Sequence, residues 1–181
     1  MTEHAFSLVA FPDVDVPEIT ITGKVIRQNN TLTIHFLIRG KTETILLPNP
    51  SAHPSRQDDL WRATCFEFFL AFPKEPFYWE FNMSPSGDWN IYHMDEYRRV
   101  GFREETLIQR LPFSVRQEAG CILVESSVDL NPIISRERRV QAAIASVIQS
   151  KDGHETYWAL FHPQSRADFH SRESFTLLLA E

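Results

Sequence analysis

Residues 60–92 read LWRATCFEFFLAF, PKEP and FYWEFNMSPSGDWNIY, and this stretch decides the fold. Residues 63–72 carry largely apolar side chains at both alternating sets of positions, which is typical of a central strand covered on both faces. PKEP and then PSGD provide turns, so residues 77–84 and 89–94 predict two further strands of a meander. A few polar side chains, Glu67 first among them, interrupt these apolar strands. We therefore expect this stretch to form the floor and wall of a pocket on a β-scaffold.

Period-two alternation continues on both sides of this stretch. EITITGKVIR and TLTIHFLIR, joined by Gln28-Asn29-Asn30, predict a β-hairpin with one buried face, since Asn tolerates the positive φ of tight turns. Ala119-Gly120 predicts a second hairpin. Turns about every 8–12 residues and about ten short strands indicate an all-β, antiparallel β-sandwich of jelly-roll or immunoglobulin-like type, with residues 1–181 as a single domain. The remaining predicted strands are 43–47, 107–118, 121–130, 140–149, 154–163 and 174–181.

Three segments are harder to assign. VQAAIASVIQ (140–149) has alanines at a spacing that also suits a helix, but its β-branched residues favour a strand. Residues 131–138 could hold one short helical turn. Residues 95–104 are charged and predicted to be irregular. PNPSAHPSRQDD (48–59) is a polar, proline-rich loop that we expect to shape the rim of a binding site.

The composition excludes some partners. Lys and Arg total 18 against 24 Asp and Glu, giving a formal charge of −6, which argues against a nucleic-acid partner because duplex binding depends on phosphate neutralisation. No apolar stretch approaches the roughly 20 residues that a membrane helix needs, so we expect no membrane partner. The N-terminus lacks the pattern of a signal peptide, which predicts a cytoplasmic protein. Cys65 and Cys121 form neither a CxxC motif nor a disulfide framework.

Glu67 is the first candidate for function. A carboxylate in an apolar central strand must be paired, hydrogen-bonded or protonated, because burying it bare is costly. One interpretation is a structural ion pair with Arg62 or Arg98. The other is a hydrogen-bond acceptor for a ligand hydroxyl, and the sequence leaves both open.

Glu80, Asn82 and Ser84 share one face of the next predicted strand. Such a face commonly points to water in an antiparallel sheet. Trp61, Trp89 and Tyr92 lie close to it in sequence, however, and flat aromatic rings beside amide and carboxylate groups suit sugars, which stack on rings while their hydroxyls bind polar side chains. We therefore include these residues in a candidate ligand pocket, although any one Trp is more often a core residue.

A third cluster follows Trp158. His162, Asp168 and His170 are spaced for a metal-binding loop, but no HExxH-type register supports one, and hydrogen bonding within the loop is the preferred interpretation. No nucleophile elbow, P-loop or dinucleotide motif is present. Glu67 and Glu80 could form a carboxylate pair for glycoside hydrolysis, at a separation that the sequence does not give.

WRATCFEFFLA, YWEFNMSPSGDWNIYHMDEYR and WALFHPQSRADFHSRESFTLLL together resemble the DOMON-like domain superfamily, which includes family 9 carbohydrate-binding modules. The resemblance spans roughly residues 15–180. It implies a β-sandwich that binds sugars or haem without turning them over. It also implies site residues: Glu67 as the strand acid, Trp61 or Trp89 and then Trp158 as two rings that clasp a sugar, with Asn82 and Arg98 as polar partners.

These observations predict a non-catalytic domain that binds a small polar ligand, a carbohydrate or glycoside, in an aromatic-lined pocket. No cofactor is expected, while haem, calcium and a homodimer formed through an edge strand are left open. A haem-binding electron-transfer or sensor domain is the first alternative, because such relatives ligate iron through Met and His, and Met83, His93 and Met94 are present. A small carboxylate-dependent glycoside hydrolase is the second. The candidate ligand-binding residues are Trp61, Arg62, Glu67, Glu80, Asn82, Ser84, Trp89, Tyr92, Arg98, Trp158 and His162.

Overall fold

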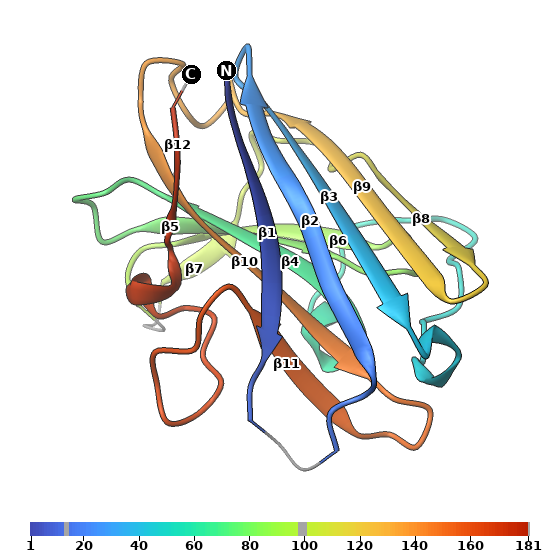
Figure 1. Ribbon diagram of the computed structural model, residues 1–181. Helices are drawn as coiled ribbons and strands as arrows, with labels where there is room; N and C mark the ends of the chain where they lie inside the picture. Colours follow the sequence, from blue (N-terminus) through green and yellow to red (C-terminus); the bar gives the residue numbers. More distant parts are fainter. Residues whose placement is uncertain (13–14, 98–100, 181) are drawn as a thin grey trace.

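The computed structural model describes residues 1–12, 15–97 and 101–180 (Figure 1). These described residues contain twelve β-strands and three short 3₁₀ helices, and no α-helix. The strands are β1 (Thr2–Ala10), β2 (Ile19–Gln28), β3 (Thr31–Gly40), β4 (Cys65–Ala71), β5 (Tyr78–Met83), β6 (Trp89–Met94), β7 (Phe102–Glu104), β8 (Phe113–Glu118), β9 (Cys121–Asp129), β10 (Val140–Gln149), β11 (Glu155–Ala159) and β12 (Leu177–Leu179). The 3₁₀ helices are η1 (Thr42–Thr44), η2 (Leu60–Arg62) and η3 (Arg172–Ser174).

The strands form one antiparallel ladder that curls into two layers. Its order is β7-β6-β5-β4-β10-β11-β1-β2-β3-β9-β8, with β12 added beside β10. The layers join where the end of β1 pairs with β11, at Val9 opposite Ala159. Figure 1 shows β1, β2, β3, β9 and β8 crossing in front of β4, β5 and β6 at a steep angle, with the two termini close together. This architecture confirms the predicted all-β, antiparallel, sandwich-like fold.

The principal core lies between the layers and is rich in aromatic rings. Phe68 of β4 stacks on Phe81 of β5 with ring centroids 4.3 Å apart, and Phe36 of β3 contacts Phe66 at 5.3 Å. The opposite face of β4 is covered as well, because Phe69 and Phe175 belong to a second, smaller cluster of buried residues. All seven residues of β4 are buried, so the prediction of a central strand covered on both faces is confirmed.

The predicted hairpin of β2 and β3 is confirmed in register and in turn chemistry. Gln28 pairs with Thr31, and Asn29 and Asn30 between them have φ values of 50° and 58°. Positive φ at both central residues gives a turn whose twist matches that of the flanking strands. The polar positions of β3 point outward, where they make cross-strand contacts.

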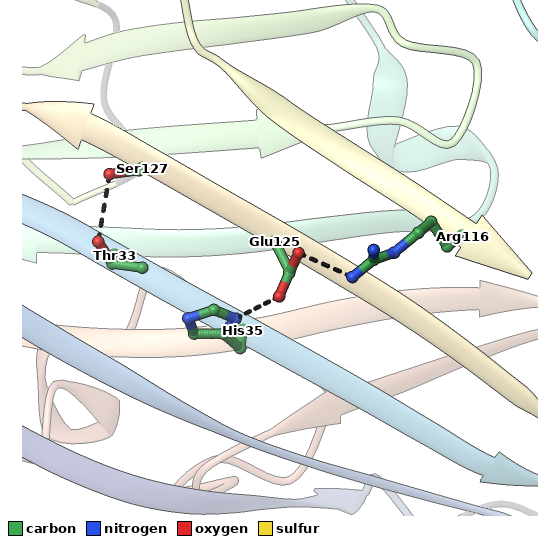
Figure 2. Close-up of polar contacts among 5 residues, drawn as sticks. All are labelled: Thr33, His35, Arg116, Glu125 and Ser127. Carbon is green, nitrogen blue, oxygen red and sulfur yellow. Dashed lines mark hydrogen bonds and ion pairs between the residues drawn. The ribbon is translucent and has the colours of Figure 1, made fainter.

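Figure 2 shows those contacts across β3, β9 and β8. The Nδ1 atom of His35 lies 3.0 Å from Oε1 of Glu125, and Arg116 Nη2 donates to the other carboxylate oxygen at 3.0 Å. Thr33 and Ser127 pair through their hydroxyls at 3.2 Å. Partly exposed pairs of this kind add little stability. They mark this face as the solvated surface of the layer formed by β1, β2, β3, β9 and β8.

Some sequence predictions differ from the structure. Residues 43–47 were predicted as a strand, but η1 occupies 42–44 and Ile45 forms only an isolated bridge with Ser150. Pro48 and Pro50 follow at once and lack backbone N–H groups, so no ladder can extend there. No helix is assigned within 131–138, which could hold one helical turn, but the Ile134 N–H donates to the Leu130 carbonyl oxygen at 2.8 Å, which closes a single turn of the α-helical type. Strand β1, at the centre of the ladder, was not predicted, and β7 lies within the segment expected to be irregular.

Gly23 is required where β2 approaches Phe6 and β3. A Cβ atom at this position would lie 1.9 Å from the carbonyl oxygen of His35 and 2.4 Å from the Phe6 ring. We expect Gly23→Ala to destabilise the protein by about 2 kcal/mol or more, because the backbone contact cannot be relieved without separating the strands. Urea unfolding measures the change, with Lys24→Ala on the exposed face of the same strand as the control. Equal midpoints for the two variants would contradict this packing.

Candidate functional site

The candidate site is a pocket of about 780 Å³ on the outward face of the layer that contains β6, β5, β4 and β10. Its floor is built from four adjacent strands, β6, β5, β4 and β10, whose order in the ladder brings their outward side chains together. Glu67 of β4 lies opposite Asn82 of β5, and Glu80 lies opposite Tyr92 of β6. Two loops form the walls. The lining residues are Gln57, Asp58, Asp59, Leu60, Trp61, Glu67, Glu80, Asn82, Tyr92, Met94, Phe102, Val147, Tyr157, Arg166, Ala167, Phe169 and His170.

Two carboxylates lie on the floor in different environments. Glu67 and Glu80 are 2% and 6% exposed, so neither is simply solvated. The Asn82 side chain donates from Nδ2 to Oε1 of Glu80 at 2.8 Å. Oε1 of Glu67, in contrast, has no hydrogen-bond partner among the described residues. Burial raises the pKa of Glu67 well above its usual value, and the nearby charge of Glu80 raises it further, while a contact with Cys65 acts in the opposite direction.

The rim on the β6 side is a hydrogen-bonded network. Tyr92 donates its hydroxyl to Asp58 Oδ1, and Asn90 Nδ2 donates to the Tyr92 hydroxyl at 3.0 Å. Arg56 holds this network from outside: its Nη1 donates to Asn90 Oδ1 at 2.9 Å, and its guanidinium lies over the Trp89 ring at 4.3 Å from the centroid. Burial and the hydrogen bond to Asp58 raise the pKa of Tyr92, so its hydroxyl stays protonated in the physiological range. The network fixes one polar wall of the pocket.

The opposite wall is the loop that contains Arg166 and His170. The imidazole Nδ1 of His170 is 2.8 Å from the Tyr78 hydroxyl, and the backbone N–H of His170 donates to Asp168 Oδ1 at 3.0 Å. Tyr97 also donates its hydroxyl to Asp168. Within residues 1–12, 15–97 and 101–180, no group of three or more His, Cys, Asp or Glu residues is arranged to hold a metal ion. The expected hydrogen bonding within the loop is seen between His170 and Asp168, whereas Tyr78 and Tyr97 connect these two residues to other parts of the fold.

The tryptophans are divided between pocket and core. Trp61 lines the pocket and is 45% exposed, with the Arg62 guanidinium 5.3 Å from its ring centroid. Trp89 and Trp158 are 7% and 5% exposed and belong to the core between the layers. Trp158 donates its indole N–H to Thr156 Oγ1 at 3.0 Å. A clasp of two tryptophans, with Trp158 as the second ring, is therefore not present; Tyr92, Tyr157, Phe102 and Phe169 are the other aromatic residues lining the pocket.

The other candidate residues lie in different places. Arg62 pairs with Asp59 at 3.3 Å rather than with Glu67. Ser84 belongs to the turn after β5, where its hydroxyl accepts from Ser86 Oγ at 2.9 Å. His162 lies at a second, shallower hollow and contacts the carbonyl oxygen of Val9 at 3.0 Å. Arg98 lies outside the described residues. Five residues of the predicted set line the same pocket: Trp61, Glu67, Glu80, Asn82 and Tyr92. Their role in binding a ligand stays a prediction.

The Met and His residues considered for haem do not converge. Met83 is fully buried in the core between the layers. His93 and Met94 are consecutive residues of β6, so their side chains point to opposite faces of the sheet. His93 stacks against Phe77 at 5.3 Å, while Met94 lines the pocket. These three residues therefore do not provide a pair of axial ligands.

Sequence reasoning missed the lining residues Asp58, Asp59 and Arg166 supplied by the loops, and considered His170 only for a metal-binding loop or for hydrogen bonding within it. The signal for the first two was present, since the proline-rich loop that ends at Asp59 was expected to form a rim. No helix in the described residues is long and apolar enough to cross a membrane.

Comparisons with known proteins relate this fold to sugar-binding structures. No protein-family model matches the chain. A search of curated proteins finds no match either. Among solved structures, a "putative carbohydrate-binding protein" from Bacteroides uniformis matches with a TM-score of 0.67 and 10% identity, over 94% of this chain and 83% of that one. A family 9 carbohydrate-binding module from Caldicellulosiruptor kristjanssonii, in complex with cellotriose, matches with a TM-score of 0.50 and 12% identity, over 83% of this chain and 70% of that one. At these identities the likeness establishes a shared β-sandwich fold.

Proposed function

We propose that this protein is a non-catalytic domain that binds a carbohydrate in the pocket on the outward face of β4, β5 and β6. The observation that carries the proposal is the combination of one exposed indole, Trp61, with buried hydrogen-bonding groups on the same pocket, Glu80 and Asn82. A sugar presents C–H groups that pack on a ring and hydroxyls that bind carboxylate and amide groups. Pockets of several hundred Å³ with a few fixed polar groups are typical small-ligand sites.

The structural neighbours support the same assignment. One is described as carbohydrate-binding, and the other holds cellotriose. The polar groups of this pocket are held in place by strands and by the Tyr92–Asn90–Arg56 network, so a ligand would meet a preformed site. Preformed sites lose less entropy when they bind.

Binding depends on Trp61 in this proposal. We expect wild-type protein to show saturable changes in tryptophan fluorescence with at least one of glucose, N-acetylglucosamine and cellotriose. We expect Trp61→Ala to weaken that binding by about tenfold or more, since one aromatic contact is worth roughly 0.5–1.5 kcal/mol beyond the area it buries. Isothermal titration calorimetry measures affinity in the variant independently of its altered fluorescence.

Two controls separate binding from folding and from catalysis. Phe161→Ala removes an aromatic ring that is 50% exposed and outside this pocket, so it should leave affinity unchanged. Trp61→Ala should also unfold at the same urea concentration as wild type. No binding across the panel would contradict the proposal, and so would turnover of chromogenic glycosides that Glu80→Gln abolishes.

A further inference from the structure

Glu67 occupies the floor of the pocket without a visible internal partner for one of its oxygens. It lies in the middle of the central strand β4, is 2% exposed, and lines the pocket. Its Oε1 has no hydrogen-bond partner among the described residues. Leaving a buried polar atom unpaired costs about 1–3 kcal/mol. Oε1 therefore gains a partner only from a molecule that enters the pocket, while the side chain keeps its contact with Cys65.

The hydrogen bonds on the floor of the pocket decide whether Glu67 is protonated or ionised. Glu80, on the neighbouring strand, already accepts the Asn82 amide hydrogen at 2.8 Å. The same amide group presents its oxygen on the Cys65 side, 3.8 Å from the thiol sulfur. Two buried carboxylates on one floor repel each other, so the one with the weaker donor takes up a proton first. Glu80 accepts from an amide, whereas the contact of Glu67 is with the Cys65 thiol, which is a weak donor. Burial and the charge of Glu80 both raise the pKa of Glu67, in agreement with this assignment.

The other ionisable groups around the pocket do not oppose the protonation of Glu67. From the rim between β3 and β4 come Asp58 and Asp59, and Asp59 pairs with Arg62 at 3.3 Å. Tyr92 of β6 and Tyr157 of β11 have raised pKa values and stay neutral, as does the buried Cys65 thiol of β4. The far loop brings His170, which contacts Tyr78, and Arg166, which is exposed to solvent at the rim. Among the described lining residues, acidic groups outnumber cationic ones.

We propose that Glu67 recognises the ligand as a neutral carboxylic acid that donates a hydrogen bond to an uncharged oxygen of the sugar. This inference rests on the proposed function and deepens it, because it assigns opposite roles to the two floor acids. Glu80 accepts hydrogen bonds from sugar hydroxyls, and Glu67 donates one to a hydroxyl, ring or carbonyl oxygen. The ligand class is then an uncharged sugar rather than an amino sugar, whose ammonium group would need Glu67 ionised.

The protonation state is tested first, without any ligand. Carbon-13 NMR of protein labelled at glutamate carboxyl carbons, titrated from about pH 4 to about pH 9, reports each glutamate. The resonance that disappears in Glu67→Gln should still belong to a protonated carboxyl at neutral pH. Glu80→Gln should lower its midpoint, because it removes the nearby negative charge. A Glu67 chemical shift that shows an ionised carboxylate at neutral pH overturns the inference, whether or not a sugar binds.

Ligand binding is tested second, by calorimetry with glucose, N-acetylglucosamine and glucosamine. Wild-type affinity for a neutral sugar should be constant at low pH and fall up to tenfold per pH unit above the Glu67 midpoint. Glu67→Gln, whose amide also donates, should bind within about threefold of wild type at neutral pH and lose this pH dependence. Glu67→Ala, which cannot donate, should lose about tenfold, and Glu80→Gln should lose affinity at every pH.

The outcomes distinguish the two proposals. Tighter binding of glucosamine than of glucose, combined with a loss in Glu67→Gln, would show an ionised Glu67 and overturn the donor role while leaving sugar binding intact. A protonated Glu67 in a protein that binds no sugar of the panel would end both the proposed function and the donor role. Retained binding in Glu67→Gln, with the pH dependence removed, supports both.

Discussion

Arg27→Met is expected to destabilise the protein by about 3–5 kcal/mol, because it leaves several buried acceptor oxygens without their donor. The Arg27 side chain is completely buried. Its Nε and Nη2 donate to Asn30 Oδ1 at 3.2 and 2.6 Å, so it closes the turn between β2 and β3. It also donates to the carbonyl oxygens of Ser135, Arg136, Arg138 and Leu179. One guanidinium thus ties the hairpin turn, the 131–139 segment and β12 together.

Methionine fills a similar volume but donates nothing. Asn30 Oδ1 and four carbonyl oxygens would each lose a donor in the interior, and hydrogen bonds to charged groups are worth about 1.5–3 kcal/mol each. Urea unfolding followed by circular dichroism gives the free energy of unfolding, and an unchanged m-value would show that the same surface is exposed on unfolding. Arg27→Lys should recover only part of the loss, because an ammonium cannot match a planar fork of donors.

Arg39→Ala provides the matched control on the same hairpin. Arg39 is exposed at the far end of β3, so its removal should change the free energy of unfolding by less than about 0.5 kcal/mol. A loss smaller than about 1 kcal/mol in Arg27→Met would mean that the network contributes little net stability.

Arg27 also illustrates what the sequence could and could not predict about the fold. The alternation of Ile19, Ile21 and Val25 predicted the buried face of the hairpin, and the structure confirms it. Arg27 falls in the same register, so a charged residue on an inward face was visible from the pattern alone. Its contacts with the carbonyl oxygens of Ser135, Arg136 and Arg138 were not, because these residues lie more than a hundred residues away in a segment without regular periodicity. Local patterns specify strands, whereas contacts between loops depend on the assembled layers.

The candidate site divides in the same way. Glu67, Glu80 and Asn82 could be placed on one pocket because their strands follow one another in a meander and the side-chain period is two. Trp158 was expected to be a ring of the pocket but lies in the core, because an aromatic ring in a strand suits either face and only the packing of the layers decides between them. Trp61, from η2, lies at the pocket, whereas Trp89, grouped with it for the same nearness in sequence, lies in the core. The walls contributed by Arg166 and His170 required the tertiary fold.

Glu67→Gln is expected to be more stable than wild type at neutral pH. The folded-state pKa of Glu67 is raised by burial and by the charge of Glu80, so the folded protein binds this proton more tightly than the unfolded chain does. Stability is therefore full below the unfolded pKa of about 4.3 and is lost as the pH rises through the folded pKa. Each unit of upward pKa displacement corresponds to about 1.4 kcal/mol of lost stability above the folded pKa. Glutamine keeps the shape of the side chain and does not ionise.

The stability difference between Glu67→Gln and wild type should be small near pH 4 and grow with pH, as measured by urea unfolding at several pH values. Each kcal/mol gained should raise Tm by roughly 2–4 °C in a chain of this size. Glu118→Gln, at an exposed position on β8, should leave the pH profile unchanged. If Glu67→Gln is instead less stable than wild type at neutral pH, the carboxylate is paired and ionised in the folded state. A residue whose replacement stabilises the fold lowers the free energy of unfolding of the wild-type protein. Residues of binding sites commonly do so, because function and stability make different demands on a side chain. Here that residue is the acid at the floor of the pocket.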